Sequence, residues 1–459
     1  MVTKINPTLV FWGVRMGFMS YGWDAGVLGG VLQTPAFQST MKVPDTTTTA
    51  MVVASFLLAS WLGCCITASP GSAAIQIVGT IISTSTYSTS QLIACRVLIG
   101  VGNGLVVAAG PVYIAETPGI LKQRGPLVGI LMGFACTGTA CAYWIDFGFT
   151  YTKGQVVWGL PIAMQIIWSL LAILLIFLNV DSLRWYFLQD RLDEGNLVLR
   201  QIYTDNHLAD KVASEIQTEL KQEVGEKLSF SDFFIEKSET KAVTRIRDGV
   251  VLVGVAYLMG INMIFHYMTT IFQVYIGLAP TTASVCSGAA TTLLAVGAFA
   301  GSIFCEKGAR RKWVLWESAL QSVFMTAFVG LLAANTKATI FSPTWAPQPY
   351  IYISETMPLR HRHTGVGLGM SAQWLMAFLT VYAGPIGFEN VGWKIWISFA
   401  VFNVTGFPYV YFFLRETRGR SLEHMTELDN EGLAVGSGSL SPNEGEGSLK
   451  GDIFIEDKI

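Results

Sequence analysis

Long apolar segments recur along nearly the whole chain and predict membrane-spanning helices. A hydrocarbon core about 30 Å thick needs about 20 mostly apolar residues per helix. Six such segments precede residue 181 and six follow residue 247. Their approximate bounds are 9–33, 49–68, 71–88, 91–115, 125–145, 158–180, 248–278, 281–305, 313–335, 338–353, 364–388 and 393–414. We therefore expect an all-α membrane protein with twelve spans, of which the tenth is short and interrupted by prolines.

The apolar pattern stops in the middle of the chain and again near its end. Between residues 181 and 247 charged and apolar residues alternate at helical spacing, which is typical of a helical segment in water. From about Asn430 the chain is rich in Gly, Ser and Glu, which predicts disorder. The predicted organisation is therefore an N-terminal six-helix bundle (1–180), a cytoplasmic helical linker (181–247), a C-terminal six-helix bundle (248–415) and a cytoplasmic tail (416–459).

Basic residues gather in alternate loops, which predicts the orientation in the membrane. If the helices simply alternate, one side holds the linker together with Lys122, Arg124, Arg310, Arg311, Lys312, Arg360, Arg362, Arg418 and Arg420. Cytoplasmic loops carry such an excess of Lys and Arg. We expect a multi-pass protein of the plasma membrane with both termini in the cytosol.

Composition supports the membrane and excludes several classes of function. Of the 459 residues, 51% are hydrophobic and 14% charged, and the net charge is −2. Too little polar surface remains to cover a soluble globule, and no basic patch suggests nucleic acid. The seven cysteines lack metal-ligand spacing, and no nucleophile-base set or cofactor loop is present. We expect neither an enzyme nor a cofactor or metal site.

Short motifs repeat between the two halves of the chain. PVYIAETPGILKQRG follows the fourth segment and PYIYISETMPLRHRHTG follows the tenth, so that each reads Pro, aromatic, Glu, then Arg. Internal duplication of this kind is how many transporters form a central site between two related bundles.

Ionisable residues inside a span cost about 3 kcal/mol each on insertion scales, which makes Asp24 and Arg96 functional candidates. Asp24 lies in YGWDAGVLGG of the first segment, and Arg96 begins RVLIGVGNG of the fourth. A carboxylate beside a movable cation can take up and release a proton as the pair separates and re-forms. A static structural ion pair is the alternative.

Polar and aromatic side chains interrupt two later spans. Tyr257, Asn262, His266 and Tyr267 share segment seven, and Gln373 lies in segment eleven with Trp374 after it. Sugar hydroxyls need amide and phenol partners, and sugar C–H faces need flat rings. These six residues therefore predict a solute site, although helix packing explains any one of them equally well.

An ordered series of motifs resembles the sugar porter family of the major facilitator superfamily, closest in character to fungal hexose, polyol or quinate permeases. The resemblance runs from about Gly17 to Met425. It rests on GWDAGVLGGV, RVLIGVGNG, PVYIAETP, YWIDFGF, DSLRW, GINMIFHY, ARR, SETMPLRHR and ETRGRSLE. It implies the major facilitator fold and transport by alternating access.

The resemblance also implies roles for particular residues. Asp24 and Arg96 match the proton-coupling pair of the symporters, and Asn262, Tyr267, Gln373 and Trp374 match sugar-site positions. Tyr21, Thr139 and Tyr350 complete the candidate solute site from segments one, five and ten. A cytoplasmic gating network is implied for Glu116, Arg124, Glu306, Arg310, Arg311, Glu355, Arg362, Glu416 and Arg418.

The chain also departs from the family pattern. Ala256 and Tyr257 stand where the family has two glutamines, and Thr139 replaces a third. Leu294 replaces an asparagine and Tyr350 a tryptophan. The basic loop expected between segments two and three is missing, and the connection between segments nine and ten is shortened.

Our leading hypothesis is proton-driven transport of a monosaccharide or polyol by a monomer in the lipid bilayer. One alternative is a permease for quinate or another hydroxy acid, which needs a cation near the site, and Arg96 is the strong candidate for it. The other alternative is a transport-inactive sugar sensor or degenerate paralogue, suggested by the missing amides.

Overall fold

The computed structural model describes residues 7–42, 45–65, 72–116, 124–178, 242–307, 310–334 and 362–413, with short stretches between 186 and 218. The first half of the chain contains a series of helices. These are α1 (Pro7–Val31), α2 (Pro35–Met41), α3 (Thr46–Cys65), α4 (Ser72–Thr84), α5 (Thr89–Glu116), α6 (Arg124–Phe149) and α7 (Val156–Phe177). The amphipathic helix α9 (Leu192–Ile202) lies within the predicted linker.

The second half is also helical where it is described. Its elements are α11 (Ala242–Leu258), α12 (Ile261–Thr270), the π-helical turn η3 (Ile271–Tyr275), α13 (Pro280–Lys307), α14 (Arg310–Ala333), α16 (Arg362–Val391), the 3-10 turn η5 (Gly392–Lys394) and α17 (Ile395–Phe413). Every predicted apolar segment within the described residues coincides with helical structure. The tenth segment and the two shortened connections lie outside them.

Length and composition make most of these helices suitable for a membrane. Eight helical stretches of the described residues are long and apolar enough to cross one, the last of them running through α16 and α17. Helix α1 is not among the eight, and it carries two charged residues, Arg15 and Asp24. The structure thus places these costly charges within a helix that has helical neighbours on several sides.

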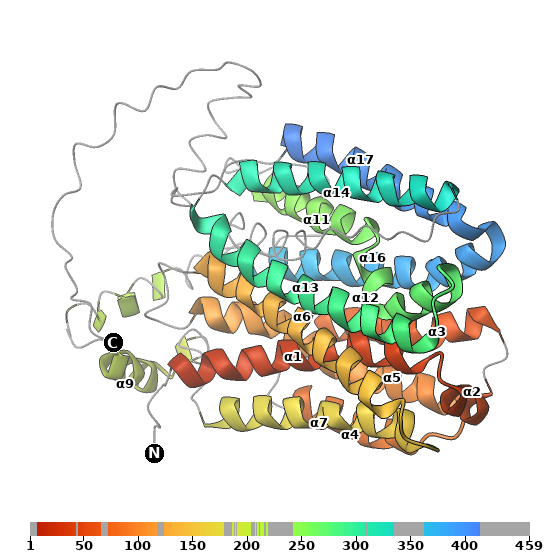
Figure 1. Cartoon of the computed structure of the whole chain (residues 1–459). Coiled ribbons are helices and arrows are strands. Elements are labelled where there is room, and N and C mark those ends of the chain that lie inside the picture. Colours follow the sequence, from red (N-terminus) through yellow and green to blue (C-terminus); the bar gives the residue numbers. More distant parts are fainter. Residues whose placement is uncertain are drawn as a thin grey trace.

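The long helices run side by side, with α4 and α7 at one edge of the view and α14 and α17 at the other (Figure 1). Helix α1 packs against α5, α6 and α7, and α3 packs against α5. On the other side α11 packs against α16, and α14 against α17. The early and late helices meet mainly where α6 packs on α13, α3 on α16 and α1 on α12.

Glycines bring α1 and α6 into close contact along most of their length. A methyl group on Gly22 would overlap the backbone carbonyl of Ala135, and one on Gly138 would overlap that of Met19. Small residues allow such approach where lipid supplies no hydrophobic drive for helix association. The register between the two helices is therefore fixed by backbone contact.

The seventh predicted segment is broken at Gly260. This residue separates α11 from α12 with a φ of +94°, a left-handed conformation that glycine adopts without strain. The break leaves the carbonyl of Met259 without its helical partner, and the Asn403 side-chain amide of α17 donates to it at 3.1 Å. Helix α12 is thereby free to turn toward α1 and α6.

Candidate functional site

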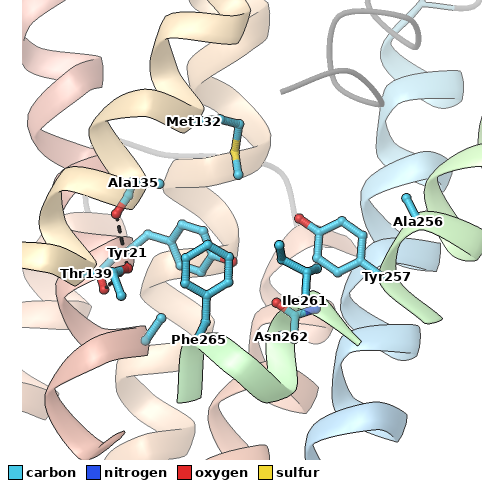
Figure 2. A pocket seen from close by; sticks show the side chains of 11 residues that line it. Tyr21, Met132, Ala135, Thr139, Ala256, Tyr257, Ile261, Asn262 and Phe265 are labelled. Atoms are coloured by element: carbon cyan, nitrogen blue, oxygen red, sulfur yellow. Dashed lines mark hydrogen bonds between the residues drawn. The ribbon is translucent and has the colours of Figure 1, made fainter. Parts of the chain in front are cut away.

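A chamber lies between α1, α6, α11 and α12. We use this name for the space lined by Tyr21, Gly22, Ala25, Met132, Ala135, Thr139, Ala256, Tyr257, Ile261, Asn262 and Phe265. Figure 2 shows Tyr21 and Thr139 toward one side, and Tyr257, Ile261 and Asn262 toward the other. Helices from both halves of the sequence therefore build its wall.

Few polar groups in the chamber wall are available to a solute. The Thr139 hydroxyl donates to the backbone carbonyls of Gly22 (2.8 Å) and Ala135 (3.2 Å), so its single hydrogen is already used. The Nδ2 group of Asn262 is buried and has no hydrogen-bond acceptor among the described residues. Most of the remaining wall is aliphatic or aromatic. The chamber wall thus carries one amide and two phenol side chains within an otherwise mostly apolar surface.

The two charges predicted inside the spans form a buried ion pair beside this chamber. Arg96 Nη1 of α5 donates to Asp24 Oδ1 of α1 at 2.7 Å, and the side chains are 4% and 1% exposed. The guanidinium also lies over the Phe56 ring, 4.9 Å from its centroid. Tyr21 precedes Asp24 by three residues, so that both occupy neighbouring positions on one face of α1.

Polar side chains on α4 and α7 support α1 just before Asp24. The Ser20 hydroxyl accepts a hydrogen bond from the Gln76 amide at 3.0 Å and forms a second one with the Ser169 hydroxyl at 2.9 Å. All three residues are buried. These contacts hold the rotation of α1, and hence the direction in which its carboxylate points.

Four predicted solute ligands are not among the residues that line the chamber. His266 Nδ1 donates to the Asn262 carbonyl at 2.9 Å, because a carbonyl oxygen only accepts. Tyr267 is buried in α12 at a kink. Gln373 and Trp374 are fully buried in α16, and neither amide atom of Gln373 has a partner among the described residues.

At one end of the chamber, Tyr143 of α6 forms hydrogen bonds with the backbone of α12. Its hydroxyl donates to the Phe265 carbonyl at 2.9 Å and accepts from the Met268 backbone N–H at 3.3 Å. Nearby, Gln33 donates to the Thr270 hydroxyl at 3.2 Å, which ties the chain beyond α1 to α12 as well. We call this set of contacts between α1, α6 and α12 the Tyr143 seam.

The remaining predicted site residues belong to parts of the chain outside the described residues and side chains. Tyr350 lies outside the described residues, and so do the side chains of the predicted gating network: Glu116, Arg124, Glu306, Arg310, Arg311, Glu355, Arg362, Glu416 and Arg418.

Sequence reasoning missed the apolar part of the wall. Met132, Ala135, Ile261 and Phe265 line the chamber, yet they carry no signal that separates them from residues facing lipid. Their helical spacing could have revealed only part of this set, since Met132 and Ala135 precede Thr139 by seven and four residues.

Known transporters resemble this chain over most of its length. The sugar transporter STL1 of Saccharomyces cerevisiae is 28% identical over 371 residues, which are 76% of this chain and 65% of STL1. The match thus spans just under two thirds of that relative. A high-affinity glucose transporter of Kluyveromyces lactis is 23% identical, with 89% of this chain and 82% of the relative covered.

Solved structures show the same fold. The proton:xylose symporter XylE bound to 6-bromo-6-deoxy-D-glucose superimposes with a TM-score of 0.75 at 20% identity, covering 92% of this chain and 98% of XylE. An inward-open structure of the xylose transporter XylE from E. coli gives 0.69 at 18% identity. These likenesses confirm the predicted all-helical major facilitator fold.

A family model matches residues 10–428, which is nearly the whole chain. Its description is "Sugar (and other) transporter". This match confirms the predicted multi-pass membrane transporter, as opposed to an enzyme, and the resemblance drawn from the motifs. The chain belongs to the sugar (and other) transporter family of the major facilitator fold.

Proposed function

We propose that this protein moves a small neutral polyhydroxylated solute, a monosaccharide or a polyol, across a membrane together with protons, by alternating access. The observation that carries the proposal is the buried pair of Asp24 and Arg96 beside the chamber. The names of STL1, the glucose transporter and the proton:xylose symporter support the same solute class and the same coupling ion.

Solute binding and proton binding are linked through α1, because this helix carries both Tyr21 of the chamber wall and Asp24 of the ion pair. A buried carboxylate is costly unless a cation accompanies it, so separation of Arg96 from Asp24 favours uptake of a proton by the carboxyl group. Solute in the chamber contacts Tyr21, one helical turn away from Asp24. Movement of α1 around the solute therefore changes the distance between the two charges.

The charge of the chamber favours a neutral solute over a hydroxy acid. None of its lining residues is ionised at neutral pH. A carboxylate solute would need a cation there, and the Arg96 guanidinium already holds Asp24. We therefore place monosaccharides and polyols ahead of quinate.

Several further features belong to the same proposal. The protein acts as a monomer in the plasma membrane, with both termini and residues 181–247 in the cytosol. The two six-helix bundles (1–180 and 248–415) rock about the chamber. The gating network closes the cytoplasmic side while the other side is open, each ion pair contributing little by itself in water.

Uptake into proteoliposomes tests the coupling. Labelled glucose, xylose, glycerol and quinate are offered with and without an inward proton gradient. We expect gradient-driven accumulation of a neutral solute, which Asp24→Asn reduces to equilibration. Asp45→Asn is the matched control, because Asp45 is an exposed acid before α3. Accumulation that survives Asp24→Asn would reject coupling through this pair, and binding without uptake would favour the sensor.

Topology mapping tests the orientation independently of the solute. A reporter inserted among residues 181–247 should be reachable only from the cytosolic side. An external reporter would overturn the proposed orientation.

A further inference from the structure

A second acid is buried at the far end of α6, and the proposed mechanism does not use it. Asp146 lies three residues before Phe149, where α6 ends, and it is 3% exposed. Neither carboxyl oxygen has a hydrogen-bond partner among the described residues. An ionised carboxylate in this position would lack compensation, and the negative end of the helix dipole would add to its cost.

The neighbours of Asp146 belong to the Tyr143 seam. Gly30 of α1 lies directly against the carboxyl group, and a methyl group at Gly30 would overlap it. One helical turn earlier, Tyr143 holds α12 through Phe265 and Met268. Gly29, the neighbour of Gly30, packs against Tyr143 and the His266 backbone. The acid therefore lies where α1 and α6 meet beneath α12.

No charge on the surrounding described elements neutralises this acid. The titratable side chains described on the helices packed against α6 and α1 are Arg15, Tyr21 and Asp24 on α1, Cys95, Arg96 and Tyr113 on α5, Cys136, Cys141 and Tyr143 on α6 itself, His266 and Tyr267 on α12, and Cys286 on α13, while α7 carries none. Tyr151 and Lys153 follow α6 and are exposed. Arg96 is paired with Asp24, which precedes Gly30 by six residues and hence lies about 9 Å away along α1. The seam as it stands therefore suits a neutral, protonated carboxyl group.

Opening of the seam would change this balance. If α1 separates from α6, or if α12 moves away from them, water reaches the carboxyl group. Hydration then removes the desolvation cost of the ionised carboxylate. Loss of the proton from Asp146 then favours the open seam, and binding of a proton to Asp146 favours the closed seam. If one proton is linked to opening, the open population rises by up to about tenfold for each pH unit.

We propose that Asp146 is a second proton-binding site, separate from the Asp24–Arg96 pair, that keeps the Tyr143 seam closed when protonated and lets it open when ionised. The inference rests on the alternating access of the proposed function. It requires neither a particular solute nor proton coupling through Asp24.

A cysteine reporter in the seam tests this inference without solute. Gln33→Cys replaces the residue that contacts Thr270, and a membrane-impermeant maleimide measures its accessibility in the full chain. Thiol reactivity itself rises with pH because the thiolate reacts. The labelling rate of each Gln33→Cys chain is first corrected for labelling of the same chain without the reporter cysteine. The quantity compared is then the rate for the chain with Asp146 divided by the rate for the chain with Asp146→Asn.

We expect this ratio to rise with pH, by up to about tenfold per unit, because only the chain with Asp146 gains an ionised acid. A ratio that does not change with pH overturns the proposal and leaves Asp146 a structural residue. The exposed acid supplies the matched control, since Asp45→Asn should leave the pH dependence intact.

Two further measurements separate this inference from the proposed function. In an Asp24→Asn background the pH-dependent ratio should persist although uptake is uncoupled. Its disappearance there would assign the effect to the Asp24–Arg96 pair and overturn the proposal. The midpoint of thermal unfolding in detergent gives a readout without the reporter cysteine. This midpoint should fall with rising pH more steeply for the chain with Asp146 than for the chain with Asp146→Asn. Equal slopes would contradict the proposal.

Discussion

The indole of Trp374 in α16 lies edge-on against the Tyr21 ring of α1, with the ring centroids 5.4 Å apart. Trp374 meets Phe56 of α3 in the same way at 6.4 Å, and the Arg96 guanidinium lies over Phe56. A continuous path of rings thus joins the chamber wall to the buried ion pair. A shift of α16 against α1 would therefore reach both the chamber and the Asp24–Arg96 ion pair.

Removal of the Trp374 ring should weaken solute binding. Each edge-to-face ring contact contributes about 0.5–1.5 kcal/mol beyond the buried area. We therefore expect Trp374→Ala to lose about 1–3 kcal/mol of stability from its two ring contacts and to raise the KM for uptake because Tyr21 loses its support, with smaller effects for Trp374→Phe. Trp316→Ala is the control, because Trp316 of α14 is 68% exposed. An equal loss in both alanine variants would show that the ring path has no specific role.

Loss of the cation alone should be worse than loss of both charges. Arg96→Gln leaves Asp24 buried without its partner, which costs about 3–5 kcal/mol of stability. Addition of Asp24→Asn removes the uncompensated charge and should restore most of that loss. Denaturation in detergent measures all four members of the cycle. A double variant no more stable than Arg96→Gln would contradict the pairing.

The contact between α1 and α6 should not tolerate a methyl group at Gly22. Gly22→Ala places a carbon into the Ala135 carbonyl, so we expect little folded protein by size-exclusion chromatography. Gly148→Ala on α6 is the matched control, since no atom lies within 4 Å of a methyl group there. A folded, active Gly22→Ala chain would mean that the two helices are farther apart.

The Tyr143 hydroxyl should hold the seam closed. Tyr143→Phe removes two hydrogen bonds to α12, each contributing about 1 kcal/mol. Labelling of a Gln33→Cys reporter should therefore accelerate by roughly tenfold or more at constant pH. The control is Tyr151→Phe, because Tyr151 is 71% exposed. Unchanged labelling would show that Tyr143 does not fasten α12.

Much of the fold follows from local properties of the sequence. Each apolar segment within the described residues coincides with helical structure, because length and hydropathy decide locally whether a helix suits lipid. The Asp24–Arg96 pair was predictable for a related reason, since an isolated charge in a span needs an opposite charge. The break at Gly260 was not predicted, because it depends on Asn403 of a distant helix to satisfy the freed carbonyl.

The candidate site was less predictable than the helices. Of the predicted ligands, Tyr21, Thr139, Tyr257 and Asn262 line the chamber, whereas Trp374 lies behind Tyr21. Residue type indicates what a side chain can bind. Helix rotation decides whether it reaches the solute.

Segment hydropathy and motif order predict that this chain spans a membrane many times and resembles sugar transporters, and the charges within its spans predict an ion pair. The packing of the helices is needed to show which apolar residues form the chamber, and that Tyr143 and Asp146 meet α1 and α12 in one seam. The two kinds of information differ because the underlying effects act over different distances along the chain. Hydropathy and the cost of a charge in lipid act residue by residue, whereas close contacts depend on the register and rotation of helices far apart in the chain.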